Sequence, residues 1–321
     1  MNELRKDYLI DRWVIIADER AKRPHDFKTE DVQDNKDKCF FCPGKEHMTP
    51  PEISRIEEDS KWIVRVIPNK FPAVSPCGVP EIKTDNTFYT YANAYGRHEI
   101  VIETSEHGKE LEDLSKEHIK KILETFILRI SELMKDPEID YVSVFKNKGK
   151  GAGASVVHCH SQIIAYNSVP ATIKYELEAS YKYYVLNKKC AFCDIISREK
   201  NSDRRVFETS QTAAFTPYAS RFPFEIWLFP KRHVSGIGEL DGDELLEFAD
   251  SLKRILSKLK EIGNAPYNLL FHSTTDYFGN YHFHVEILPR LTTWAGFELE
   301  TGTIINPVSP EDAAKFYRGE L

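Results

Sequence analysis

The sequence predicts an α+β fold in which one plan occurs twice, as two antiparallel-sheet halves that each carry a packed helix. The first observation is an ordered repeat. In both halves a C-x-x-C pair is followed by a strand, a histidine, a long helix, a strand and an H-x-H strand. The second is the spacing, because Glu99 to His107 (107 − 99) and Glu225 to His233 (233 − 225) are both eight residues apart. We expect the halves to be residues 1–170 and 171–321.

Short apolar runs between turn residues predict the strands. They cover residues 13–17, 63–67, 98–103, 141–145 and 156–165 in the first half, and 225–229, 267–271 and 282–288 in the second. Apolar residues spaced by three and four predict two amphipathic helices. One covers 115–135 with Ser115 as its N-cap, and the other covers 241–262. Asp241 and Glu244 have the spacing of a capping box at the start of the second helix.

Composition excludes several classes of protein. The 321-residue chain is 41% hydrophobic and has a net charge of −7, with no long basic run. This argues against a broad nucleic-acid-binding face, although a small anionic ligand still fits a local pocket. No apolar stretch approaches the length of a membrane span, and the first residues show no signal core. We expect a cytoplasmic protein, in which cysteine pairs are metal ligands or redox centres and not a disulfide framework.

The two C-x-x-C pairs predict metal centres, because each supplies two thiolates from one turn and tetrahedral zinc needs two further ligands. Histidines recur in register at both places. His107 to His158 is 51 residues (158 − 107), and His233 to His282 is 49 (282 − 233). We expect two zinc ions per chain, held by Cys39, Cys42, His107 and His158 in the first half and by Cys190, Cys193, His233 and His282 in the second. The alternative is a buried or redox-active cysteine pair at each place.

His158 and His160 lie one residue apart, directly after the glycine-rich run 147–155. Residues i and i+2 of a strand face the same side, so the two imidazoles are expected to face one direction. Glycines let the backbone approach an anion closely, and an imidazole can attack phosphorus. With His158 assigned to zinc, we expect His160 to be a nucleophile. The alternative is a structural histidine, and we assign no chemistry to His284, its counterpart in the second half.

These residues resemble the galactose-1-phosphate uridylyltransferase family of the histidine triad superfamily. The resemblance covers most of the chain and is specific because several motifs occur together. They are Arg20-Ala21-Lys22-Arg23-Pro24, Cys39-Phe40-Phe41-Cys42-Pro43-Gly44, Val66 through Pro72, Asn147-Lys148-Gly149, and Gly153-Ala154-Ser155 through His158-Cys159-His160-Ser161-Gln162. The resemblance implies a duplicated histidine-triad fold and a homodimer with active sites near the subunit interface.

The resemblance also implies a ping-pong reaction. A nucleotide sugar gives its nucleoside monophosphate to His160 and releases a hexose 1-phosphate, and a second hexose 1-phosphate or another phosphate acceptor then takes the nucleotide. Gln162 and Ser155 would act with His160 by holding the phosphoryl oxygens. The implied substrate contacts are Arg20 and Arg23 near the nucleotide phosphates, Asn69 and Phe71 in the nucleoside pocket, and Asn147, Lys148, Gly149 and Glu298.

Two departures from the family pattern leave the substrate open. Cys159 stands where the family usually has proline between the histidines, and the segment 294–302 lacks the usual lysine and glutamine contacts to the sugar phosphate. This segment and the second C-x-x-C pair are closer to relatives that use adenine nucleotides, such as ADP-glucose phosphorylase. We expect UMP transfer between hexose 1-phosphates, with an ADP-glucose enzyme of the same fold as the alternative. A zinc-stabilised nucleotide-binding module without catalysis and a hydrolase of dinucleotides are further alternatives.

Overall fold

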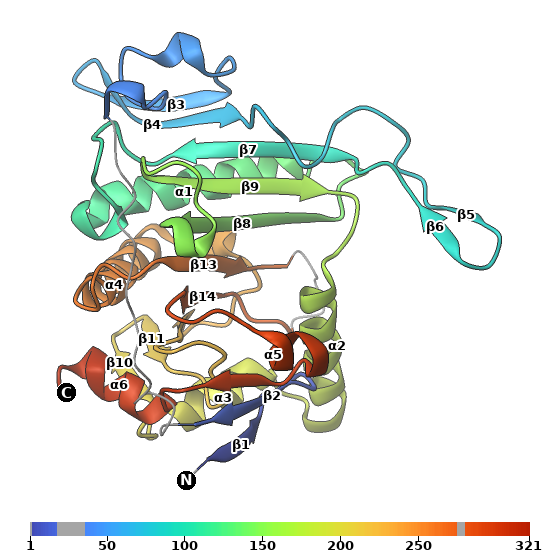
Figure 1. The fold of residues 1–321 in the computed structure, drawn as a ribbon, viewed down its shortest axis with the longest axis vertical. Coiled ribbons are helices and arrows are strands. Elements are labelled where there is room, and N and C mark those ends of the chain that lie inside the picture. Colours follow the sequence, from blue (N-terminus) through green and yellow to red (C-terminus); the bar gives the residue numbers. More distant parts are fainter. Residues whose placement is uncertain (1, 18–35, 275–279) are drawn as a thin grey trace. The chain divides into compact units, whose positions relative to one another are not determined.

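The computed structural model describes residues 2–17, 36–274 and 280–321, and the chain forms two compact units. One unit comprises Gln33–Lys146 and Val156–Ala171, and the other comprises Met1–Val32, Asn147–Ser155 and Thr172–Leu321. Figure 1 shows the elements of each unit along the sequence. Among the described residues, no helix has the length and apolar character that a membrane span requires.

The first unit contains an antiparallel sheet with the strand order β3-β4-β7-β9-β8. Its strands are β3 Ser54–Glu58, β4 Lys61–Pro68, β7 Gly96–Ile102, β9 His160–Tyr166 and β8 Tyr141–Lys148. A separate hairpin consists of β5 Lys83–Asp85 and β6 Tyr89–Tyr91. The short 3-10 helices of this unit are η2 Lys36–Lys38, η3 Glu46–Met48 and η4 Leu111–Asp113.

Helix α1, Lys116–Leu133, covers one face of this sheet (Figure 1). Ser115 begins it as predicted, since its side chain accepts a hydrogen bond from the backbone N–H of His118. The predicted apolar stripe includes Ile119, Ile122, Leu123, Phe126 and Leu133, which are buried. A bidentate ion pair from Arg129 to Glu99, with both N–O distances 2.8 Å, joins α1 to β7. The predicted arrangement of one helix on one antiparallel sheet is therefore confirmed in this half.

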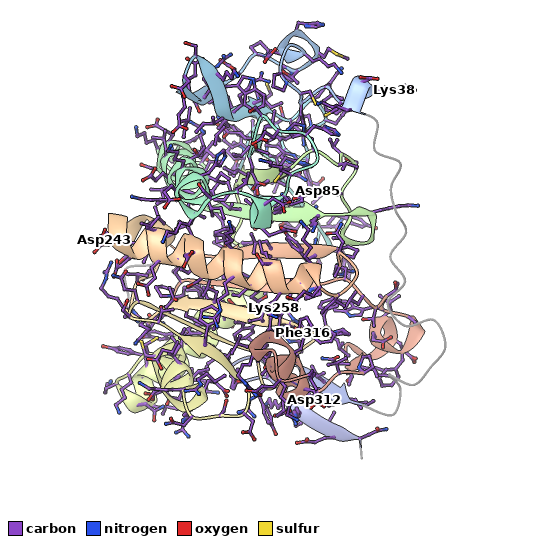
Figure 2. All side chains as sticks on the ribbon, turned by 90° about the vertical axis from the view of Figure 1, so that its left-hand side faces the viewer. Lys38, Asp85, Asp243, Lys258, Asp312 and Phe316 are labelled. Atoms are coloured by element: carbon purple, nitrogen blue, oxygen red, sulfur yellow. The ribbon has the colours of Figure 1, made fainter. Side chains whose placement is uncertain are left out.

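The second unit repeats the plan with the strand order β10-β11-β12-β14-β13, again antiparallel. Its strands are β10 Arg205–Glu208, β11 Thr212–Phe215, β12 Ile226–Pro230, β14 His284–Pro289 and β13 Tyr267–His272. Helix α4, Gly242–Lys260, packs on it, and Asp241 and Glu244 form the predicted capping box. Figure 2 shows Asp243 and Lys258 near opposite ends of α4, which suits the helix dipole.

The strand predicted over 13–17 is confirmed as β2 Trp13–Ile16, which lies in a small sheet with two strands that were not predicted, β1 Glu3–Lys6 and β15 Ile304–Asn306. Other elements of this unit were not predicted either. They are the helices α2 Ala171–Asn187, α3 Ala191–Glu199, α5 Gly296–Thr301 and α6 Pro310–Arg318, and the 3-10 helices η5 Lys150–Ala152 and η6 Ile237–Glu239. The parallel pairing of β15 with β2 joins the two ends of the chain. Of these strands, only the one beginning at Trp13 has a sequence signal long enough to recognise.

Both H-x-H strands begin later than predicted. The strand expected over 156–165 starts at His160, and that expected over 282–288 starts at His284. The first histidine of each pair therefore lies just outside its strand. This position lets its ring turn towards the cysteine pair while the second histidine stays in the ladder of the sheet.

Candidate active site and metal centres

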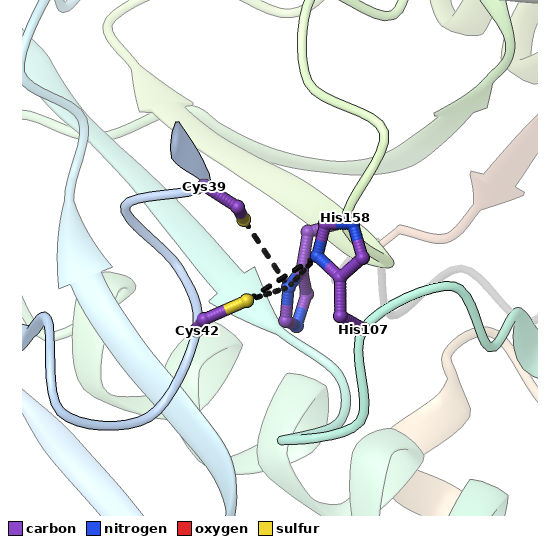
Figure 3. A group of neighbouring side chains, drawn as sticks. All are labelled: Cys39, Cys42, His107 and His158. Carbon is purple, nitrogen blue, oxygen red and sulfur yellow. Dashed lines mark hydrogen bonds between the residues drawn. The ribbon is translucent and has the colours of Figure 1, made fainter. Parts of the chain in front are cut away.

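Cys39, Cys42, His107 and His158 come together as predicted, and Figure 3 shows their side chains pointing towards one another. Their ligand atoms all lie within 4.8 Å of one another. His107 Nδ1 lies 3.3 Å from His158 Nδ1 and 3.3 Å from Cys42 Sγ, and Cys39 Sγ lies 3.4 Å from His158 Nδ1. A zinc tetrahedron with ordinary bond lengths has edges of about 3.3 Å between nitrogens and about 3.5 Å between nitrogen and sulfur. The four residues therefore fit one tetrahedral ion.

Hydrogen bonding supports this fit. His158 Nε2 lies 2.8 Å from the carbonyl oxygen of Thr104, which only accepts, so this nitrogen carries the hydrogen. Nδ1 of His158 then presents a lone pair towards Cys39 and His107. A lone pair that faces sulfur and a second nitrogen at these distances is stabilised by a cation between them.

The second predicted set, Cys190, Cys193, His233 and His282, also comes together. Cys193 Sγ lies 3.3 Å from His233 Nδ1 and 3.4 Å from His282 Nδ1. His282 Nε2 donates to the carbonyl oxygen of Pro230 at 2.9 Å, as His158 does to Thr104. The scaffold differs between the halves, because Cys190 is the N-cap of α3 and Cys193 lies in its first turn. Here a helix, and not an irregular turn, brings the two sulfurs to one side.

A third group of possible metal ligands was not predicted. Glu176, His272, His284 and Glu286 are all buried and have their ligand atoms within 4.8 Å of one another. Burial alone would lower the pKa of His272, but the charges of Glu176 and Glu286 raise it to about 8. Arg221 also pairs with Glu286, so the cluster already contains a compensating cation. Its members come from α2, β13 and β14, and their separation in sequence left no spacing signal.

His160 is the first residue of β9 and is 5% exposed. Its Nδ1 lies 2.7 Å from the carbonyl oxygen of His158, so Nδ1 carries the hydrogen and Nε2 the lone pair. Burial lowers the pKa of His160 to about 4, and the positive charge of Lys146 acts in the same direction. The ring is therefore neutral near pH 7. Phe41 packs edge-on against the rings of both His158 and His160.

A buried charged cluster supports His160 from the other side of the strand. Lys146 Nζ lies 2.7 Å from Glu103 Oε2, and both side chains are at most 1% exposed. Lys146 also donates to Cys159 Sγ at 3.2 Å and to the carbonyl oxygen of His160 at 3.3 Å. Ser161 donates to the other oxygen of Glu103 at 2.5 Å. Three consecutive residues, Cys159 to Ser161, are thus bound to one ion pair, and Cys159 faces away from the histidine rings as predicted.

The predicted substrate-binding residues of this unit lie on or beside the sheet. Gln162 is half-buried in β9 and contacts His98, and Asn69 contacts the same histidine. Phe71 is 81% exposed, so its ring is accessible to a ligand. Ser155 is exposed and belongs to the other unit, together with the rest of the glycine-rich run.

The glycine-rich run has its contacts within the second unit. Asn147 accepts a hydrogen bond from Asn268, and Lys148 donates to Asn264 and lies over the ring of Tyr267. Gly149 has a φ of +78°, which favours glycine, and a Cβ there would lie 3.1 Å from Pro266, which would have to shift slightly. Glu298 accepts from the backbone N–H of Ala295 and caps α5. Arg20 and Arg23 lie outside the described residues.

The two halves, each joining a Cys₂His₂ cluster to an H-x-H strand, define a duplicated histidine-triad protein. Residues 1–170 match the family model of the galactose-1-phosphate uridyl transferase N-terminal domain, and residues 96–316 match a domain of unknown function. The chain belongs to the galactose-1-phosphate uridylyltransferase family. It is accordingly an enzyme of a nucleotidyltransferase family.

Relatives with two different names are similar to this chain. ADP-glucose phosphorylase of Arabidopsis thaliana is 37% identical over 98% of this chain and 92% of its own length. Galactose-1-phosphate uridylyltransferase of Thermotoga maritima is 31% identical over 99% of this chain and 98% of its own. A crystal structure of the Arabidopsis thaliana ADP-glucose phosphorylase with bound ADP-glucose superimposes with a TM-score of 0.84, at 34% identity over 99% of both chains. The relatives therefore support the adenine-nucleotide alternative about as well as they support the predicted UMP transfer.

Proposed function

We propose that the protein transfers a nucleoside monophosphate through a covalent nucleotidyl-His160 intermediate, with UMP as the predicted group and hexose 1-phosphates as the partners. The observation that carries the proposal is the hydrogen bond from His160 Nδ1 to the carbonyl oxygen of His158, 2.7 Å long. It fixes the ring and leaves the lone pair on Nε2, which is what a nucleophilic imidazole needs. The low pKa of His160 keeps that lone pair unprotonated at neutral pH.

The reaction has two balanced steps. His160 Nε2 attacks the α-phosphorus of a nucleotide sugar, the nitrogen–phosphorus bond forms, and the bond to the departing hexose 1-phosphate breaks. A phosphate oxygen of the second substrate then attacks the same phosphorus, and the bond to Nε2 breaks. The hydrogen on Nδ1 stays with the His158 carbonyl throughout, and the positive charge of the nucleotidylated ring is shared along that bond.

The remaining predicted residues have roles in binding. Gln162 and Ser155 hold the phosphoryl oxygens with Asn147 assisting, and Lys148 and Gly149 also bind the substrate. Asn69 and Phe71 line the nucleoside pocket, Arg20 and Arg23 bind the nucleotide phosphates, and Glu298 is a further substrate-binding residue. Apart from that of Glu298, these assignments follow the family motifs on which the residues lie.

We propose two zinc ions, one in each Cys₂His₂ set, as structural ions whose binding energy contributes to folding. Closed sets of four protein ligands favour this role over a catalytic one. We also propose a cytoplasmic homodimer with halves 1–170 and 171–321, of which only the first carries the nucleophile.

An ADP-glucose phosphorylase or adenylyltransferase activity is the second candidate, favoured by the 37% identity to the Arabidopsis thaliana enzyme. One experiment separates the candidates. The protein is incubated with UDP-glucose or with ADP-glucose, each labelled at the α-phosphate, and label retained on the denatured protein is counted. We expect retention from UDP-glucose. Retention from ADP-glucose alone would replace the uridylyl proposal by the adenylyl one, and retention from neither would leave a non-catalytic binding module.

Adding acceptors to the labelled protein identifies the second step. Hexose 1-phosphate or inorganic phosphate should remove the label as a nucleotide sugar or a nucleoside diphosphate, respectively. Release as the free monophosphate without any acceptor would indicate a hydrolase.

A further inference from the structure

His98, in β7, lies on the same face of the sheet as His160 and Gln162. The register places His98 opposite Ile164, and Ile102 opposite His160, and directly paired residues share a face. His98 is 9% exposed, and its Nε2 lies 2.9 Å from Oε1 of Gln162. The sequence offered no reason to single out this histidine.

The backbone fixes which nitrogen of His98 carries the hydrogen. The N–H of Ala73 donates to His98 Nδ1 over 3.2 Å, and a backbone N–H can only donate. Nδ1 therefore holds the lone pair, and in a neutral ring the hydrogen lies on Nε2. Burial lowers the pKa of His98, so the ring is neutral at pH 7. Nε2–H then donates to Oε1 of Gln162, which leaves both amide hydrogens of Gln162 for other acceptors.

The same hydrogen also affects Asn69. The backbone N–H of Phe71 donates to Asn69 Oδ1 at 2.9 Å, which orients the amide with Nδ2 towards His98 at 3.1 Å. Nε2 of His98 cannot accept from Asn69 while it carries its own hydrogen. The amide hydrogens of Asn69 are consequently also left for another acceptor.

We infer that His98 is a positioning residue that sets the orientation of the Gln162 amide, so that its NH₂ group donates to a phosphoryl oxygen of the nucleotide on His160. The inference rests on the proposed function, because it gives Gln162 a phosphoryl group to bind. Without the bond from His98, the Gln162 amide is free to rotate and present its oxygen, which repels the phosphoryl oxygens. Donors held in place before the reaction stabilise developing charge best.

Two substitutions distinguish the contributions of the two ring nitrogens of His98. An asparagine amide reaches about as far as Nδ1 and keeps a partner for Ala73, whereas a glutamine amide reaches about as far as Nε2 and keeps a donor for Gln162. We expect His98→Asn to slow formation of the nucleotidyl protein at saturating donor by about tenfold, with little change in the half-saturating concentration. His98→Gln should recover most of that loss. His47→Asn, the same change at an exposed histidine, is the control and should leave the rate unchanged.

A double-mutant cycle tests whether His98 acts through Gln162. His98→Asn/Gln162→Ala should be no slower than Gln162→Ala alone, and additive losses would overturn the inference. So would a His98→Asn rate equal to that of wild type. In wild-type protein labelled with ¹⁵N-histidine, Nε2 of His98 should show the shift of a protonated nitrogen, and the opposite tautomer would overturn the inference even if the variants fail to fold. Wild-type protein that takes no label would instead overturn the proposed function, and the role of His98 with it.

Discussion

Lys146→Met should be strongly destabilising, because it removes the cation from a buried ion pair. Lys146 is 1% exposed and Glu103 is not exposed at all, and their charged atoms lie 2.7 Å apart. Methionine has a similar length but neither charge nor donors. The substitution leaves the Glu103 carboxylate with only the thiol of Cys159 at 2.9 Å and the hydroxyl of Ser161 at 2.5 Å. It also removes the cation that pairs with the less buried Glu110 at 3.2 Å.

The magnitude follows from what remains around Glu103. Removing one partner of a buried ion pair costs about 3–5 kcal/mol, because a desolvated charge is left uncompensated. The two surviving hydrogen bonds place the expected loss at the lower end, about 3 kcal/mol. That is a large part of the free energy of unfolding of an ordinary domain, which is about 5–15 kcal/mol. Urea unfolding of the zinc-loaded protein at pH 7.5 measures it, and the Lys146→Met/Glu103→Leu double variant should recover at least half of the loss.

The pH dependence gives an independent check on the cause. Burial alone would raise the pKa of Glu103, but the charge of Lys146 brings it below its ordinary value of 4.5. In the wild type the stabilisation from ionised Glu103 beside Lys146 is therefore present above pH 4.5 and is lost as the pH falls below it. In Lys146→Met the buried Glu103 carboxyl has a raised pKa and takes up a proton as the pH falls. The cost of burying an uncompensated carboxylate therefore becomes smaller at lower pH. The reasoning would be refuted if Lys146→Met lost less than about 1 kcal/mol of unfolding free energy at pH 7.5. It would also be refuted if that loss were larger at pH 5.5 than at pH 7.5.

Three further predictions concern the metal centres and the local conformation. Cys42→Ser and Cys193→Ser should each lower the zinc content by about one ion per chain, and elemental analysis showing no loss in either would contradict the assignment of that centre. Gly149→Ala should cost about 1–3 kcal/mol in urea unfolding, because φ is +78° with ψ at 158° and the new Cβ would lie 3.1 Å from Pro266; unchanged stability would contradict this. Asp241→Ala should cost about 1 kcal/mol by the same assay, since it removes the acceptor of two backbone N–H groups at the start of α4, and an unchanged midpoint would count against that role.

Much of the fold was predictable because each half has strong local signals. The Ser115 cap, the Asp241 capping box and the apolar stripes of α1 and α4 act within a few residues of one another, so they can be recognised in a single sequence. The repeat then paired each C-x-x-C with the correct two histidines. Neither inference needed knowledge of distant contacts.

Other features depend on contacts that the sequence does not encode locally. Lys146 in β8 and Glu103 directly after β7 lie 43 residues apart, and they meet only when both strands pair with β9. Glu176 reaches His272 across 96 residues, so that cluster has no motif. The role inferred for His98 depends on the N–H of Ala73 and the amide of Gln162, which lie 25 and 64 residues from it in the sequence. The second C-x-x-C pair was recognised, but its helix was not.

The central claim is the covalent nucleotide on His160, and one mass measurement tests it most directly. Wild-type protein incubated with donor and no acceptor should gain the mass of one nucleoside monophosphate on the peptide that contains His160. His160→Gly should gain none, should keep its zinc because His158 is unchanged, and should nucleotidylate free imidazole in solution when imidazole is added. His158→Asn should instead lose metal and stability. A His160→Gly protein that turns over at near the wild-type rate without imidazole would contradict the covalent mechanism.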